Sequence, residues 1–183
     1  KIRGGNLKHC CMAVLFSTAL TAQSYDLKNE KAAIARIEAS VAAGGHADFM
    51  KECDELLDPH RINALAWYLC GKHLLSVPVK DLAQGRKNAR IAYARLKRAA
   101  DDFARTSKQV FYATDAQQYL GLAAMLLGDL DRAQVHFRSV LLRDNRIPAA
   151  WYNLGVIYEL KGLTEESMRA YDRYLRLKNA GDA

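Results

Sequence analysis

The residues best suited to bind a metal are two cysteines and two histidines in the first half of the chain. Cys70 and His73 are three positions apart, so on a helix they share one face, and Cys53 and His60 precede them. Cysteine thiolates and histidine nitrogens are the ligands of structural zinc sites, which need four such groups in a tetrahedron. A site here would require all four side chains to converge. We favour a simpler interpretation, in which Cys70 packs inside the fold and His73 lies at its surface, and we expect no metal.

No other group of residues has the composition of a catalytic site. Gly71-Lys72-His73 lacks the earlier glycine and the following serine or threonine of a phosphate-binding loop, so nucleotide binding has no support. Neighbouring carboxylates lie where helices are expected to start or to face solvent, at Asp101 and Asp102, Asp129 and Asp131, and Glu165 and Glu166. No serine or cysteine nucleophile has a supporting base. We therefore expect no enzyme activity, no cofactor and no small-molecule substrate.

Positive charge is concentrated in one part of the sequence. The chain of 183 residues has a formal net charge of +7, and between positions 80 and 98 it has seven basic residues against Asp81 alone. Five of them form what we name the basic segment: Arg86, Lys87, Arg90, Lys97 and Arg98. It could meet an acidic protein surface or anionic lipid headgroups, and the alternative is a solvated helix face. Nucleic acid is the least expected partner, because few aromatic residues lie among the charges.

The first 22 residues have the pattern of a targeting segment. Basic residues precede an apolar run from Cys10 to Leu20, and the small residues Thr21 and Ala22 follow. This order of basic region, short apolar core and small-residue cleavage site is that of a secretory signal. We predict a signal over residues 1–22 and export, in a bacterium to the periplasm. A mitochondrial presequence and a first helix of the fold are the alternatives.

The rest of the chain contains an internal repeat of 34 residues. The first helix of each copy has the spacing W-x2-L-G-x2-Y, filled by Trp151, Leu154, Gly155 and Tyr158 and, one period earlier, by Gln117, Leu120, Gly121 and Ala124. The second helix has the spacing A-x3-F, at Ala133 and Phe137 and again at Ser167 and Tyr171. Gly128 and Gly162 mark the turns. From Thr114 to Leu177 the pattern resembles the tetratricopeptide repeat family.

The resemblance implies an all-α fold, a right-handed superhelical stack of about four antiparallel helix pairs. We expect one tetratricopeptide repeat domain over residues 23–183, with repeats at 31–63, 64–113, 114–147 and 148–181. The first repeat is divergent. The second contains an insertion at 77–98, because Ala99 and Phe103 give its best match to the second helix. The basic segment would then project from an edge of the stack.

Two kinds of contact inside the stack follow from this register. Paired helices approach closely only where small residues face each other, so Gly121 should meet Ala133 and Gly155 should meet Ser167. Cys53 and Cys70 lie at equal distances from a turn near residues 61 and 62, so the two helices should bring them together. In an oxidising compartment they could form a disulfide, and otherwise they are two buried thiols.

In this family the first helices of the pairs line the concave side, where a partner segment binds. The resemblance places seven side chains there: Tyr68, Lys72, Gln118, Leu122, Tyr152, Asn153 and Val156. They form a mixed surface suited to an extended or helical segment of modest polarity, unless Leu122 and Tyr152 pack between neighbouring first helices. Beyond them, Tyr174 and Leu177 would have no following repeat to cover them, so we expect an apolar end face.

These features favour a non-enzymatic scaffold or adaptor that binds a segment of another protein. Exported proteins that resemble this one commonly serve envelope assemblies, so we expect a secretion, pilus or outer-membrane machine. The alternatives are an organellar assembly factor or a small subunit of a large complex and, from another class, the regulatory part of a larger enzyme. Fold alone does not decide among them.

Overall fold

The computed structural model describes residues 64–105 and 110–181, together with residues 32, 35–37, 39, 40, 49–51, 53 and 54. All regular structure in these residues is α-helical. The continuous part contains α3 (Ala64–Ser76), α4 (Leu82–Arg105), α5 (Val110–Leu127), α6 (Leu130–Arg143), α7 (Pro148–Leu160) and α8 (Thr164–Gly181). The predicted signal at 1–22 and most of the predicted repeat at 31–63 lie outside the described residues.

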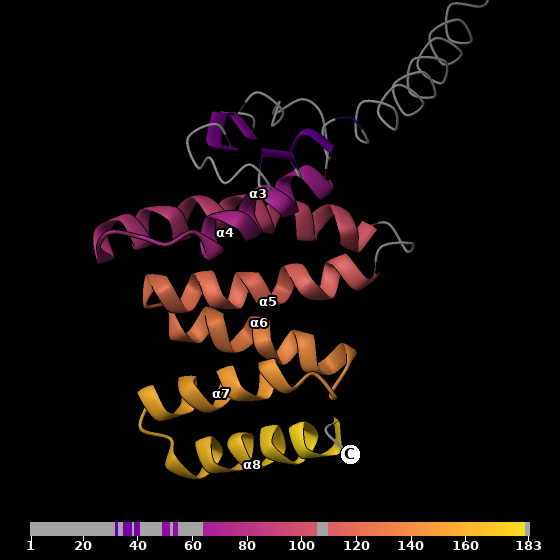
Figure 1. Ribbon diagram of the computed structural model, residues 1–183. Coiled ribbons are helices and arrows are strands. Elements are labelled where there is room, and N and C mark those ends of the chain that lie inside the picture. Colours follow the sequence, from indigo (N-terminus) through magenta and orange to yellow (C-terminus); the bar gives the residue numbers. More distant parts are fainter. Residues whose placement is uncertain are drawn as a thin grey trace, which may run out of the picture.

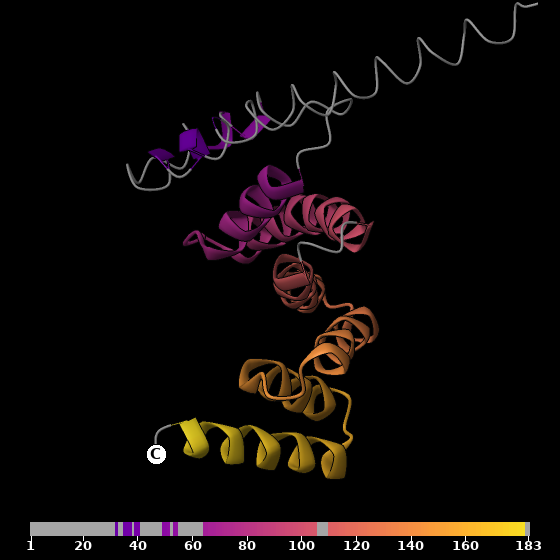
Figure 2. The same cartoon turned by 90° about the vertical axis from the view of Figure 1, so that its right-hand side faces the viewer.

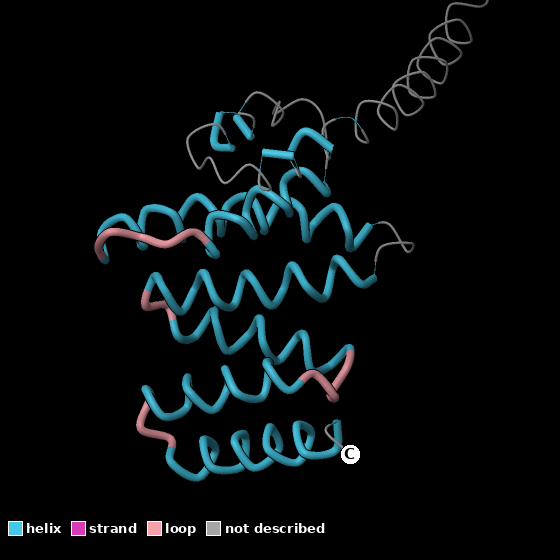
Figure 3. The backbone as a smooth tube through the Cα atoms, in the orientation of Figure 1, coloured by secondary structure: helices cyan, strands magenta, loops and turns pink. Residues whose placement is uncertain are grey.

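The six helices form antiparallel pairs that stack in chain order (Figure 1). Among the described links, those from α3 to α4, from α5 to α6 and from α7 to α8 lie on one side of the stack, and the link from α6 to α7 lies on the opposite side, as the tube view in Figure 3 shows. Seen from the side, α6 is displaced relative to α5 and α7, so the stack is not flat (Figure 2). The predicted fold class, an all-α stack of helix pairs, is confirmed.

Short signals in the sequence end one helix and begin the next. Gly128 and Gly162 have φ angles of 81° and 72°, a left-handed conformation that glycine adopts without a steric penalty, and they follow α5 and α7. Asp129 caps α6 by accepting a hydrogen bond from the backbone N–H of Arg132 at 3.0 Å. Pro148 opens α7, where its missing N–H costs no hydrogen bond.

Within each pair, a glycine lies under a large side chain of the second helix. A methyl group on Gly121 would be 2.6 Å from the ring of Phe137, and one on Gly155 would be 2.5 Å from the ring of Tyr171. Phe137 and Tyr171 are therefore the side chains nearest to these two glycines. The predicted contact of Gly155 with Ser167 is confirmed, because the Ser167 hydroxyl donates to the backbone carbonyl of Gly155 at 3.0 Å. Each glycine lets a bulky side chain of the next helix sit on its backbone, so that Phe137 is fully buried and Tyr171 is half-buried.

The same contact gives the register of the first complete pair, and it corrects the predicted insertion. A methyl group on Gly71 would be 2.6 Å from Leu96 Cγ, so Leu96 takes the place of Phe137. Residues 77–98 do not form a projecting insertion, since all but the link at 77–81 belong to the 24-residue helix α4. The predicted match at Ala99 and Phe103 is wrong by seven positions, which is two helical turns.

The described residues before α3 pack against it. Ile37, Phe49 and Cys53 are buried together with Ala66 and Cys70 of α3. The structure brings the two cysteines together in a disulfide, with their Cα atoms 6.1 Å apart. A covalent link therefore holds the segment before α3 to the stack.

Removing this disulfide should destabilise the fold. The cysteines are 17 positions apart in the sequence, and closing a loop of this length stabilises a protein by about 3 kcal/mol. The variant with Cys53→Ala and Cys70→Ala should lose about that much free energy of unfolding in urea denaturation. Dithiothreitol should lower the stability of the wild type by a similar amount and leave the double variant unchanged. A wild type insensitive to the reductant would contradict the bond.

The contact of Gly71 with Leu96 can be tested by a double-mutant cycle. Gly71→Ala should destabilise, because crowding at this site costs about 1–3 kcal/mol, more than the roughly 1 kcal/mol that alanine gains over glycine in a helix. In a Leu96→Ala background the same change should become stabilising, measured by urea denaturation. In a Phe103→Ala background it should stay destabilising. The opposite pattern in the two backgrounds would restore the register first predicted.

Candidate functional site

The two predicted binding residues on α3 are held by contacts inside the protein. Tyr68 is buried and donates a hydrogen bond to the carboxylate of Asp115 on α5. Lys72 Nζ lies 3.2 Å from the Tyr68 hydroxyl and 3.6 Å from Asp115 Oδ2, and it sits 5.0 Å from the centre of the Tyr119 ring. Burial, together with the Asp115 carboxylate, raises the pKa of Tyr68. Tyr68 therefore joins α3 to α5 and offers no surface to a partner, while Lys72 already has an acidic neighbour.

The predicted residues on α5 and α7 keep part of their surface in solvent. Gln118, Leu122 and Val156 are half-buried, and Leu122 packs against the core between α5, α6 and α7. Tyr152 is 47% exposed, which makes it the most accessible aromatic residue in the set. Asn153 uses its amide N–H to donate to the carbonyl of Ala149 at 2.9 Å, which leaves its side-chain carbonyl free to accept.

The predicted end face needs a correction. The Tyr174 ring packs against Tyr152 with centroids 5.3 Å apart, and Leu177 is half-buried. The exposed apolar side chains of α8 are instead Met168 and Leu175, at 68% and 53%. One repeat period earlier, the same positions are residues 134 and 141 of α6. Since α7 packs on α6, these positions belong to the face of a second helix that contacts the next pair. Tyr174 therefore belongs with Tyr152 and Tyr171, whose ring centroid is 5.8 Å from that of Tyr152, in a group that we name the tyrosine cluster.

The basic segment lies along α4 and is only partly free. Arg86, Lys87 and Arg90 are exposed and have no acidic partner among the described residues. Lys97 is 3.4 Å from Asp101, one turn further along α4. Arg98 lies 4.9 Å above the ring of Trp67 and is half-buried. The segment is therefore a cationic stripe of three residues on the solvent face of a packed helix.

Two of the four residues considered as zinc ligands are not available to bind a metal. The sulfurs of Cys53 and Cys70 are bonded to each other, and the ring of His73 lies 3.8 Å from that of Phe49. His60 is outside the described residues. In the part of the chain that the structure describes, no group of three or more histidine, cysteine and acidic side chains is placed to hold a metal ion. None of the described helices is long and apolar enough to cross a membrane.

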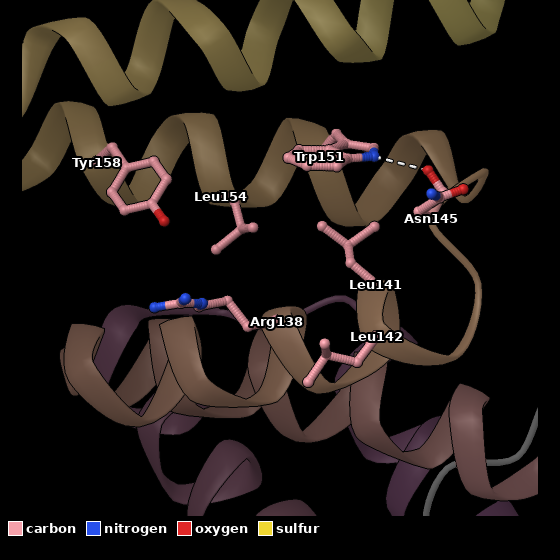
Figure 4. Close-up of a pocket in the computed structure, with 7 residues that line it drawn as sticks. All are labelled: Arg138, Leu141, Leu142, Asn145, Trp151, Leu154 and Tyr158. Atoms are coloured by element: carbon pink, nitrogen blue, oxygen red, sulfur yellow. Dashed lines mark hydrogen bonds between the residues drawn. The ribbon is translucent and has the colours of Figure 1, made fainter.

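A pocket that the sequence did not predict lies between α6 and α7 (Figure 4). Its volume is about 500 Å³, and it is lined by Arg138, Leu141, Leu142, Asn145, Trp151, Leu154 and Tyr158. The Trp151 Nε1–H donates to the backbone carbonyl of Asn145 at 2.8 Å, so the indole presents its apolar ring to the pocket. The sequence contains only a partial signal, the apolar residues Val135 and Leu142, which lie seven positions apart on one exposed face of α6.

Polar side chains also connect α4, α5 and α6. His136 Nδ1 lies 2.8 Å from Gln117 Oε1, and His136 Nε2 lies 3.1 Å from the Tyr93 hydroxyl. The amide oxygen can only accept, so Nδ1 carries the proton and Nε2 accepts from Tyr93. Burial lowers the pKa of His136, and the charge of Arg132 lowers it further, against the opposing effect of Asp129. These two hydrogen bonds and the lowered pKa favour the neutral form of the His136 imidazole.

The fold and these contacts define a helical-repeat protein without a recognisable catalytic constellation in the described residues. Residues 148–180, which are α7 and most of α8, match the family model of the tetratricopeptide repeat, so the chain contains such a repeat. No curated protein matches the chain.

Solved structures with a similar arrangement of helices include two titled "Crystal structure of MamA" and "Crystal structure of MamA protein", each 16% identical to the chain. The first covers 80% of this chain and 96% of its own with a TM-score of 0.42, and the second 83% and 93% with 0.41. A third, "MamA MSR-1 C2", is 12% identical and covers 84% and 98% with a TM-score of 0.40. These values are too low to carry a functional comparison.

The His136 contact should make stability depend on pH in a defined direction. Because its pKa in the folded state lies below the ordinary value of 6.5, the unfolded chain binds a proton more readily. The contribution of His136 to the free energy of unfolding should therefore be complete above that ordinary value and should fall as the pH drops below it. Urea denaturation at pH 7.5 and 5.5 should show a larger loss for the wild type than for His136→Gln. Equal losses would contradict the assignment.

Proposed function

We propose that this protein is a non-enzymatic adaptor that binds a segment of a partner protein on the face formed by α5 and α7. The observation that supports this best is the exposure of Tyr152. The residue is 47% exposed although its ring lies against those of Tyr171 and Tyr174, which hold it in place. A rigid aromatic side chain that is ordered before binding loses little entropy when a partner covers it.

The residues around Tyr152 suit a peptide backbone. Asn153 has a free side-chain carbonyl, which can accept from a backbone N–H of a bound segment. Gln118 on α5 can both donate and accept, and Leu122 and Val156 add partly exposed apolar surface. Arrays of helical repeats commonly use such extended surfaces for binding. The partner segment would place an apolar residue on Tyr152 and its backbone beside Asn153.

We also propose that the protein acts outside the reducing cytosol, in a bacterial envelope assembly such as a secretion, pilus or outer-membrane machine. Disulfides persist in oxidising compartments, and the bond between Cys53 and Cys70 fits such a setting. The basic and apolar pattern of residues 1–22 supports the same destination. Within such an assembly the protein would hold one subunit against another.

Changing the proposed surface should weaken partner binding without unfolding the protein. A variant with Tyr152→Ala and Asn153→Ala removes an aromatic anchor, whose truncation typically costs about 2 kcal/mol, or roughly a 30-fold rise in Kd. The partner is first captured from the source organism with the wild type, and Kd is then measured by calorimetry.

Val135→Ala serves as the matched control, because it truncates an exposed apolar residue on α6. It should leave Kd unchanged. Unchanged binding by the Tyr152 and Asn153 variant, with an unchanged melting temperature, would remove this surface from consideration and leave the basic segment as the next candidate.

A further inference from the structure

We infer that the pocket between α6 and α7 is a second docking site, which takes an acidic amphipathic segment of a partner protein. An apolar side chain of the segment would enter the pocket, and a carboxylate would meet Arg138. The inference rests on the proposed function in its general class, protein binding. It places the contact on another surface, so the two can be tested separately.

The pocket opens away from α5, whereas the tyrosine cluster lies on α7 and α8. Phe137 of α6 packs on Gly121 of α5, so this side of α6 faces α5. Leu142 is five positions further along, which at 100° per residue turns it by about 140° from Phe137. Leu142 is accordingly 89% exposed. A segment bound here would lie along α6 and α7 on the outer side of the stack.

The floor and one end of the pocket are apolar. Leu141, Leu154 and the ring of Trp151 face the space between the helices, and Leu142 stands at its rim (Figure 4). The indole N–H already donates a hydrogen bond to Asn145, so this end of the pocket needs no polar group from a ligand. The volume of about 500 Å³ lies within the range of pockets that hold ligands and is larger than one aliphatic side chain needs. An exposed leucine beside an open apolar pocket favours an apolar ligand group.

The other end of the pocket is positively charged. Arg138 from α6 and Tyr158 from α7 reach into it from opposite sides (Figure 4). Among the described residues, Arg138 has no acidic partner and the Tyr158 hydroxyl has no hydrogen-bond partner. Arg132 pairs with Asp129 at 3.2 Å and Arg146 with Asp144 at 3.2 Å. Arg143 of α6 has no acidic partner among the described residues, but it does not line the pocket.

This charge pattern points to a carboxylate. A guanidinium group binds a carboxylate through two parallel hydrogen bonds, and a phenol hydroxyl adjacent to it can donate a third. One cation beside an apolar slot does not suit nucleic acid, whose binding needs several cations along a strand. It suits the helix-in-groove mode, in which apolar residues of an amphipathic helix fill a groove and flanking charges set the orientation.

The experiment begins with a random 12-residue peptide library displayed on phage, selected against the purified, disulfide-bonded chain. Enriched peptides should carry aspartate or glutamate within four positions of leucine, isoleucine or phenylalanine. A synthetic peptide of the enriched sequence should bind at least tenfold more tightly than its copy with glutamine and asparagine in place of the acids. Selection of no peptide above background, or of peptides without acidic residues, would overturn the proposal.

Variants of the protein then locate the binding site. Arg138→Gln should weaken binding of the synthetic peptide at least tenfold, and Leu142→Glu should abolish it. Arg143→Gln is the matched control, because it removes the same charge from α6 without lining the pocket, and it should change Kd less than twofold. Equal effects of the two arginine variants would show unspecific attraction and would also overturn the proposal.

The variant with Tyr152→Ala and Asn153→Ala separates this proposal from the proposed function. It should bind the selected peptide like the wild type. If it loses binding while Arg138→Gln retains it, the peptide binds on the face of α5 and α7. The proposed function would then stand and the pocket would be excluded. Circular dichroism melting should show all variants folded, since Arg138 and Leu142 are exposed.

Discussion

The close approach of paired helices over a glycine is the contact on which the rest of this structure depends. It occurs three times in the described stack, with Leu96 on Gly71, Phe137 on Gly121 and Tyr171 on Gly155. A single methyl group at any of these positions would collide with the opposite side chain. Because the contact fixes how far each second helix is shifted along the first, it also fixes which side chains face the neighbouring pair.

Polar contacts then connect one pair with the next. The hydrogen bond from Tyr68 to Asp115 joins α3 to α5, and Lys161, in the turn after α7, bonds Asp131 of α6 at 2.7 Å. His136 links α6 to both preceding helices. Apolar packing alone would tolerate some sliding of one pair against another, whereas hydrogen bonds of defined geometry require one arrangement, and those of Tyr68 and His136 are partly buried. The surfaces that we propose for binding therefore depend on contacts between the pairs.

The sequence was sufficient to predict the helices and their pairing, because small and large residues recur with the period of the repeat. It was not sufficient to place the second helix of the first complete pair. Ala92 with Leu96 and Ala99 with Phe103 have the same spacing and lie seven residues apart, on the same face of one helix. Only the three-dimensional contact with Gly71 distinguishes them.

The candidate site was predicted less well, because exposure depends on neighbours that periodicity does not describe. Tyr68 has the position of a surface residue in the repeat pattern, but the aromatic rings of α4 and α5 cover it. The pocket beside Leu142 depends on how far α7 stands from α6, which no single residue signals.

The disulfide also makes the two sides of the described stack unequal in how easily they separate. In a linear array each pair is stabilised by its immediate neighbours, so structure is lost most easily from an end. The crosslink between Cys53 and Cys70 ties the segment before α3 to that helix and opposes fraying there. The pair of α7 and α8 has no such tether among the described residues. Under a mechanical pull, the pair of α7 and α8 should therefore separate before the crosslinked side, which is released last.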